Sequence, residues 1–217
     1  MKTRPPVQVA VAVLLRADGT VLLADRPAGK PYAGYWEFPG GKIEPAETVA
    51  QALARELDEE LALQIEHALP WVTYEHDYPH AYVRLHFARI YAWRGQPQPR
   101  EGQRVGFYAI TGPLPAPLLP AALPALAWLR LPEVLQLPRG QLPADAAPVQ
   151  TRTELHAAAA AGKRFALAGP VASPSDWAQL ALLACGTPLP LYAWGELGAA
   201  DLPRARAAGL HGVVQFY

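Results

Sequence analysis

The chain has 217 residues, and its 19 Lys and Arg residues balance its 19 Asp and Glu residues, so the formal net charge is zero. Hydrophobic residues make up 51% of the chain, which is enough for a packed core and excludes a wholly disordered protein. Zero net charge argues against binding polymeric nucleic acid through a basic surface. The single cysteine, Cys185, excludes an internal disulfide.

The first apolar run, residues 7–15, predicts a buried strand. An Asp18-Gly19 turn follows, and we expect residues 21–24 to return as the second strand of a hairpin. The run is too short to cross a membrane, and no small-residue cleavage site follows it. We therefore expect a cytoplasmic protein with no membrane partner.

The strongest helical signal covers residues 46–61, directly after a loop rich in Gly and Pro at residues 27–41. This stretch holds no Gly or Pro, and its apolar residues recur at helical spacing, which predicts one buried stripe. Further strands are predicted over residues 72–75, 82–93 and 107–110, and a short helix over residues 124–131.

Three carboxylates of the predicted helix, Glu56, Glu59 and Glu60, are spaced i, i+3 and i+4, so they share one face. One interpretation is a solvated acidic face with Arg55 as an ion-pair partner. The other is a site for a hard cation, because Mg²⁺ and Mn²⁺ prefer oxygen ligands. The preceding loop favours the second interpretation, since Gly40-Gly41 brings a free backbone carbonyl beside the carboxylates.

Prolines are concentrated between Pro113 and Pro148, where the pattern changes. We predict a first domain over residues 1–132, a Pro-rich linker over 133–148 and a second region over 149–217. In the second region, apolar runs at 165–171, 189–194 and 212–216 alternate with helical stretches at 153–161, 174–184 and 199–208. Alternation of this kind predicts parallel βα units.

The run Gly41-x5-Glu47-x7-Arg55-Glu56-Leu57-x-Glu59-Glu60, with Leu63 at its last apolar position, resembles the Nudix box. The one departure inside the box is Ala62, where the family has glycine, and we expect a somewhat altered helix end there rather than lost chemistry. Residues 35–44 resemble the MutT branch, and the resemblance covers about residues 5–131. It implies an α/β fold for this part, the α+β Nudix fold with a mixed β-sheet sandwiched by helices.

The resemblance also implies the roles of individual residues. The metal, Mg²⁺ or Mn²⁺, would be bound by the carbonyl of Gly40 and by Glu56, Glu59, Glu60 and the loop residue Glu101. The catalytic set would be Glu56 as general base and Glu59, with Glu47 and Arg55 in support. The substrate would be bound by Arg26, Phe38, Gly41 and Lys42.

The implied reaction is attack of water on the substituted β-phosphorus of a nucleoside triphosphate, which yields a nucleoside monophosphate and pyrophosphate. The implied partner is a nucleoside triphosphate or another nucleoside diphosphate-linked small molecule. Relatives that cleanse 8-oxo-dGTP read the oxidised purine with an asparagine, but Ala122 stands at that position here, and the chain contains no asparagine. Loss of such a contact predicts relaxed base discrimination.

The second region resembles the last βα units of thiamine-phosphate-synthase-like barrels, but it is too short for a whole TIM-like barrel. Gly195-Glu196 replaces that family's phosphate-binding glycine pair, so we predict an incomplete, non-catalytic βα region. Its open sheet edge would be covered by the first domain or by a second copy in a homodimer. Two alternative functions stay open: hydrolysis of thiamine-related pyrophosphates, and a regulatory protein whose C-terminal region senses a ligand.

Overall fold

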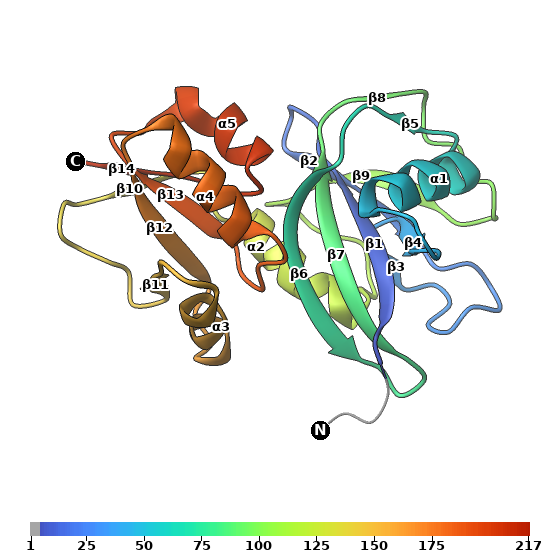
Figure 1. The fold of residues 1–217 in the computed structure, drawn as a ribbon. Coiled ribbons are helices and arrows are strands. Elements are labelled where there is room, and N and C mark those ends of the chain that lie inside the picture. The colour runs from blue at the N-terminus through green and yellow to red at the C-terminus, as the bar shows by residue number, and fades with distance from the viewer. Residues whose placement is uncertain (1–4) are drawn as a thin grey trace. The chain divides into compact units, whose positions relative to one another are not determined.

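The computed structural model describes residues 5–217, so residues 1–4 of the predicted first domain lie outside the described part. The chain divides into two compact units (Figure 1). The first contains residues 5–68 and Glu75–Arg130, and the second contains Leu69–Tyr74 and Leu131–Tyr217. Strand β6 (Leu69–Asp77) therefore contributes residues to both.

The other elements of the first unit are, in chain order, β1 (Val7–Leu14), β2 (Thr20–Asp25), β3 (Trp36–Glu37), β4 (Gly40–Lys42), α1 (Val49–Leu61), β5 (Gln64–Ile65), β7 (Tyr82–Ile90), β8 (Trp93–Arg94), β9 (Val105–Ala109), the 3₁₀ turn η1 (Pro120–Ala122) and α2 (Leu123–Leu129). They build a sheet in the order β4-β1-β7-β6, a second in the order β3-β2-β9, and the pair β5-β8. The predicted α/β fold is confirmed.

The predicted hairpin is wrong beyond its turn. A single bridge joins Leu15 to Val21, after which β1 and β2 enter different sheets. The reason is that both edges of β1 are occupied, by β7 in parallel along its whole length and by β4 in antiparallel pairing. Strand β2 instead pairs with β3 and β9.

The predicted helix is confirmed as α1, which covers one face of the sheet that contains β1 (Figure 1). It begins at Val49 rather than at residue 46, because Ala46 has a left-handed backbone (φ 67°) and Thr48 caps the helix. The Thr48 hydroxyl accepts from the Gln51 N–H, and the Gln51 side chain accepts from the Thr48 N–H. The buried stripe packs on the strands through Ala52, Leu53, Leu57 and Leu61.

Helix α1 ends at the position where the sequence departs from the Nudix box. Ala62 adopts the left-handed conformation with φ 56° and ψ 34°. Its N–H donates to the Asp58 carbonyl, and the Leu63 N–H donates to the Leu57 carbonyl, so the chain turns sharply out of the helix. An alanine here holds a conformation that glycine adopts with less strain.

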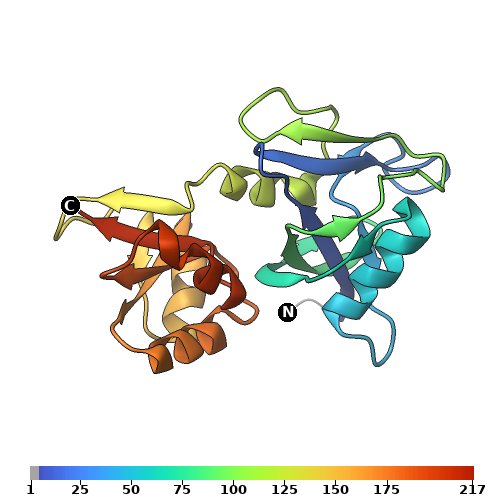
Figure 2. The same ribbon diagram turned by 90° about the horizontal axis from the view of Figure 1, so that it is seen from above.

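The second unit is a parallel five-stranded sheet in the order β10-β14-β13-β12-β11, which confirms the predicted βα repeat. Its elements are β10 (Val134–Leu137), β11 (Ala146–Pro148), α3 (Arg152–Ala160), β12 (Phe165–Val171), α4 (Pro174–Ala184), β13 (Leu191–Gly195), the 3₁₀ turn η2 (Ala199–Asp201), α5 (Leu202–Ala207) and β14 (Gly212–Phe216). Figure 2 shows β10, in yellow, beside β14, in red, although they are far apart in sequence. The segment 133–148, which we predicted as a linker, holds β10 and β11 of this sheet.

A buried histidine ties together distant parts of the second unit. His211 is 1% exposed. Its Nδ1 accepts from Trp71 Nε1 at 3.2 Å, and its Nε2 lies 3.1 Å from the Leu131 carbonyl oxygen. Both ring nitrogens are therefore used in holding the fold. Among the helices of residues 5–217, none has the length and apolar character needed to cross a membrane.

Candidate active site

The first unit contains a cleft of about 850 Å³ beside the sheet that carries β1 and β7. Alternate residues of these strands, such as Val9, Val11, Leu85 and Phe87, form an apolar floor. The two-residue alternation sends the other face of the same strands, with Ala10 and Ala12, to the core under α1. The cleft therefore has an apolar floor on the sheet face opposite to the helix.

Arg55 collects the carboxylates of the first part of the Nudix-like motif. It donates to Glu47 through two nitrogens at 2.8 and 3.0 Å, to Glu56 Oε1 at 2.9 Å and to Glu59 at 3.4 Å. A fourth contact, to the Lys42 carbonyl oxygen at 3.0 Å, ties the helix to β4. Hydrogen bonds from Arg55 and from the Glu44 N–H lower the pKa of Glu47 to about 2, and the carboxylates in turn raise the pKa of Arg55.

The two glycines of β4 are required by close packing. A Cβ on Gly40 would overlap the carbonyl of Ala10 in β1, and Gly40 has φ 147°, where side chains are disfavoured. A Cβ on Gly41 would overlap the carboxylate of Glu56. Glu56 therefore occupies the space that the missing side chain leaves, directly against the turn, and both glycines line the cleft.

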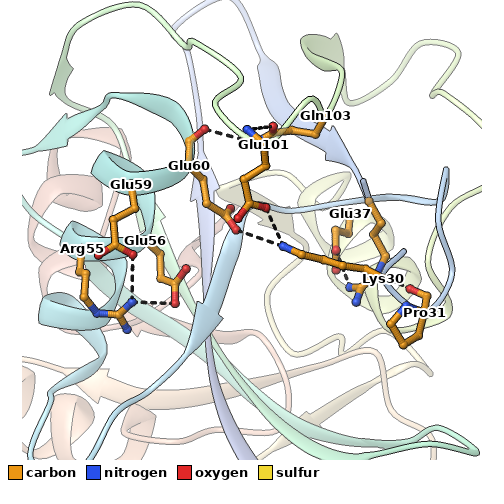
Figure 3. Close-up of polar contacts among 10 residues, drawn as sticks. Lys30, Pro31, Glu37, Arg55, Glu56, Glu59, Glu60, Glu101 and Gln103 are labelled. Carbon is orange, nitrogen blue, oxygen red and sulfur yellow. Dashed lines mark hydrogen bonds and ion pairs between the residues drawn. The ribbon is translucent and has the colours of Figure 1, made fainter. Parts of the chain in front are cut away.

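Glu60 and Glu101 form the second carboxylate pair, and the ammonium of Lys30 contacts both (Figure 3). Lys30 Nζ is 2.6 Å from Glu101 Oε2 and 3.9 Å from Glu60 Oε1. Burial, and to a smaller extent the nearby carboxylate of Glu101, raises the pKa of Glu60 to about 7, although the ammonium of Lys30 opposes this shift. All three residues line the cleft.

The loop that carries Glu101 is anchored to the last turn of α1. The Glu101 N–H donates to Gln103 Oε1 at 2.8 Å, and Gln103 Nε2 donates to the Glu60 carbonyl at 3.2 Å. Arg100 adds its backbone N–H to the same carbonyl and its guanidinium to the Asp58 carbonyl. These contacts satisfy helix-end carbonyls that would otherwise lack partners, and they bring Glu101 beside Glu60.

Glu59 differs from the other predicted ligands. Its side chain is 61% exposed, it pairs with Arg55, and it is not among the residues that line the cleft. Figure 3 shows Glu59 directed toward Arg55, whereas Glu60 is directed toward Lys30. Successive helix residues differ by about 100° in direction, so the neighbours Glu59 and Glu60 face different sides.

The predicted substrate-binding residues line the same cleft, namely Arg26, Phe38, Gly41 and Lys42. Arg26 does not pair with Asp25, which binds Arg104 instead. Arg26 donates to Glu37 Oε1 and to the Pro31 carbonyl, both at 2.6 Å. Burial raises the pKa of Glu37, although Arg26 opposes this shift. Phe38 is 4% exposed and packs edge-on against Phe87.

The sequence did not identify three polar residues of the site: Lys30, Glu37 and Gln103. Lys30 lies in the Gly- and Pro-rich loop, and Glu37 lies within the MutT-like stretch, so their positions in the sequence indicated that they could belong to the site. Nothing in the local sequence of Gln103 indicates that its side chain reaches the end of α1. Tyr78, His80, Ala121 and Ala122 also line the cleft.

The oxygen donors present suit a hard divalent cation. Glu56, Glu60 and Glu101 face one cleft with the Gly40 backbone, and Gly41 leaves the room that Glu56 needs. Within residues 5–217, no three acidic, His or Cys side chains already stand close enough to hold a metal. The carboxylates are instead divided between two cations, with Glu56 on Arg55 and with Glu60 and Glu101 on Lys30.

In the second unit, backbone donors that would suit a phosphate are already bonded. Asp176 accepts from the N–H groups of Ala172 and Ser173, which lowers the pKa of its carboxyl. Asp201 accepts from the Gly198 N–H at 2.9 Å. A carboxylate at each of these positions opposes anion binding. The absence of catalysis in this unit stays a prediction.

The fold and the cleft define a class of protein: a hydrolase with carboxylates and cationic side chains arranged around a Gly-Gly turn. Residues 5–146 match the model of the NUDIX domain, and the chain belongs to the Nudix family. It is a MutT-like Nudix hydrolase. The 8-oxo-dGTP diphosphatase of Proteus vulgaris is 35% identical over 107 residues, which cover 49% of this chain and 96% of that protein.

Two further relatives cover more of the chain. The CTP pyrophosphohydrolase of Escherichia coli (strain K12) is 36% identical over 135 residues, covering 62% of this chain and 96% of that protein. The crystal structure of a MutT NUDIX hydrolase from Burkholderia pseudomallei has a TM-score of 0.53 and 31% identity, and the match covers 57% of this chain and 98% of that one. The Proteus vulgaris and Escherichia coli relatives are named for different substrates.

Proposed function

We propose that the protein is a divalent-metal-dependent pyrophosphohydrolase that converts nucleoside triphosphates to nucleoside monophosphates and pyrophosphate. The observation that carries the proposal is that Glu56, Glu60 and Glu101 face the same cleft as Arg26 and Lys42. Carboxylates for a cation and basic groups for phosphate thus meet in one place. Such a cleft fits the free nucleotides of the cytoplasm, the location predicted from the sequence.

The metal would be held by Glu56, Glu60, Glu101 and the Gly40 carbonyl, with Glu59 reaching it only after leaving Arg55. When bound, a divalent cation supplies a Lewis acid that activates water and offsets phosphate charge. Arg55 fixes Glu56 through Oε1, which leaves Oε2 to accept the proton of the attacking water. The water oxygen bonds to the β-phosphorus, and the bond from that phosphorus to the oxygen bridging to the α-phosphorus breaks.

The apolar residues that line the cleft near Ala122 support relaxed base selection. Ala122 occupies the position of the purine-reading asparagine, and the neighbouring Ala121 and Leu119 also line the cleft with apolar side chains. A site that hydrogen-bonds its substrate can reject an unpaired analogue by about 10⁴-fold, whereas apolar contacts discriminate by about 10²-fold or less. We therefore propose 8-oxo-dGTP as one substrate among several. A pyrimidine triphosphate is the second candidate, as the name of the Escherichia coli relative suggests.

The test is a hydrolysis panel with Mg²⁺ that contains 8-oxo-dGTP, dGTP, dCTP, CTP, thiamine pyrophosphate and ADP-ribose, with release of pyrophosphate and monophosphate measured separately. We expect turnover of the triphosphates, with kcat/KM values within about 10² of one another. Turnover of thiamine pyrophosphate alone would overturn the proposal, as would the absence of turnover of every nucleotide.

The site assignment is tested by Glu56→Gln and Glu60→Gln, each expected to lower kcat by about 10²-fold or more. Asp58→Asn is the matched control, because Asp58 lies on the same helix, is exposed and does not line the cleft. Full activity in Glu56→Gln would refute its assignment as base.

A further inference from the structure

Lys30 is held at the cleft by the geometry of its loop. Gly29 before it has φ 87°, a backbone conformation that favours glycine, and the Lys30 N–H donates to the Pro27 carbonyl. The Pro31 carbonyl after it accepts from Arg26 Nε at 2.6 Å. The backbone on both sides is thereby fixed, and the long side chain reaches the carboxylates of Glu60 and Glu101 (Figure 3).

The two cations of the site differ in how firmly they are held. Arg55 is 26% exposed and makes four kinds of contact, including the paired hydrogen bonds to Glu47. Lys30 is 46% exposed and is held through ion pairs to the two carboxylates. Exposed ion pairs change an equilibrium by a factor of about five or less. Lys30 is therefore the cation that a stronger one displaces.

We propose that Lys30 exchanges partners during binding. It neutralises Glu60 and Glu101 before metal binds, and it binds the substrate phosphates once a divalent cation has bound those carboxylates. This inference rests on the proposed function. An ammonium on a flexible four-carbon stem can move by several ångströms without any change of the loop backbone. After displacement it stays in a cleft where the triphosphate is the nearest anion of high charge.

The exchange has a consequence for affinity. Before substrate is present, Lys30 competes with the metal and weakens its binding. With metal present, Lys30 is released for the substrate and strengthens its binding. Each ligand therefore favours the other, and this coupling must be reciprocal. Removal of the ammonium is expected to shift the two affinities in opposite directions, which a purely structural role of Lys30 would not do.

The test uses the full chain and measures binding without turnover. The variant is Lys30→Met. The probes are Mn²⁺ alone and then a non-hydrolysable α,β-methylene nucleoside triphosphate at saturating Mn²⁺. We expect Mn²⁺ alone to bind about three- to fivefold more tightly than in the wild type. The analogue should bind about tenfold more weakly, since a charge-assisted contact to phosphate is lost. Lys30→Arg should restore both values toward those of the wild type.

Lys163→Met is the matched control, because it makes the same change in net charge at a half-buried lysine of the second unit, whose ammonium donates to the Ala144 carbonyl. Both affinities should be unchanged in it. Weaker binding of both probes to Lys30→Met would overturn the proposal and leave Lys30 as a loop anchor. Tighter Mn²⁺ binding with unchanged analogue affinity would also overturn it, as would unchanged Mn²⁺ affinity. If the wild type binds Mn²⁺ and the analogue but hydrolyses no nucleotide, the proposed function fails while the exchange is still measured.

Discussion

Replacing Ala62 with glycine should stabilise the protein, because Ala62 ends α1 in the left-handed conformation (φ 56°). That conformation costs an alanine about 1–2 kcal/mol relative to glycine. Glycine also gives the unfolded chain more freedom, which offsets about 0.4–1 kcal/mol of the gain. We therefore expect Ala62→Gly to raise the free energy of unfolding by about 0.5–1 kcal/mol, or the midpoint temperature by about 2 °C.

The assay is urea and thermal unfolding followed by far-ultraviolet circular dichroism. The control is Ala208→Gly, since Ala208 also caps a helix but has a negative φ of −80°. At Ala208 only the greater freedom of glycine in the unfolded chain applies, so Ala208→Gly should lower the free energy of unfolding by about 0.5–1 kcal/mol. Two glycine substitutions at helix ends are thus expected to act with opposite sign. An equal loss of stability in both variants would refute the explanation from backbone conformation.

Two further predictions concern the site and the pH dependence of stability. Gly41→Ala places a Cβ on the Glu56 carboxylate and should lower kcat/KM by about 10²-fold with the fold retained. Gly198→Ala, where a Cβ meets open space, should leave kcat/KM unchanged. Steady-state kinetics measure the loss of activity, and circular dichroism shows whether the fold is retained. Burial, and to a smaller extent the charge of Arg84, lowers the pKa of His86. Below about pH 6.5 the unfolded state therefore binds more protons than the folded state. His86 thus contributes stability at neutral pH that is lost as the pH falls below about 6.5. His86→Gln should weaken this dependence between pH 5 and 7 in urea titrations, and an identical pH profile would refute the attribution.

The predictions that held are those that depend on local patterns. The apolar stripe of α1, its end at Leu61 and the carboxylate spacing all follow from the helical period, which the sequence displays directly. The strands and helices of the second unit were recognised for the same reason, because each is a continuous run between turn residues. The short strands β10 and β11 were missed because prolines surround them and their regularity comes from pairing with β14 and β12.

The arrangement of the first unit depends on pairing between distant segments. The parallel ladder of β1 with β7 joins residues far apart in the chain and removes β1 from the predicted hairpin. A parallel pair has no turn that marks it in the sequence, so the choice between β2 and β7 as neighbour is made by the packing of the whole sheet.

The sequence by itself determined the family, the acidic helix and the glycine turn before it, because these residues are close in the chain and their spacing fixes their relation. It could not distinguish Glu59 from Glu60, whose directions differ by one helical step, until the position of the cleft was known. It also could not bring Lys30 to Glu101, which lies 71 residues further on. Only the tertiary structure decided these contacts, since they join a loop, a helix end and a second loop that meet through packing rather than through any local pattern.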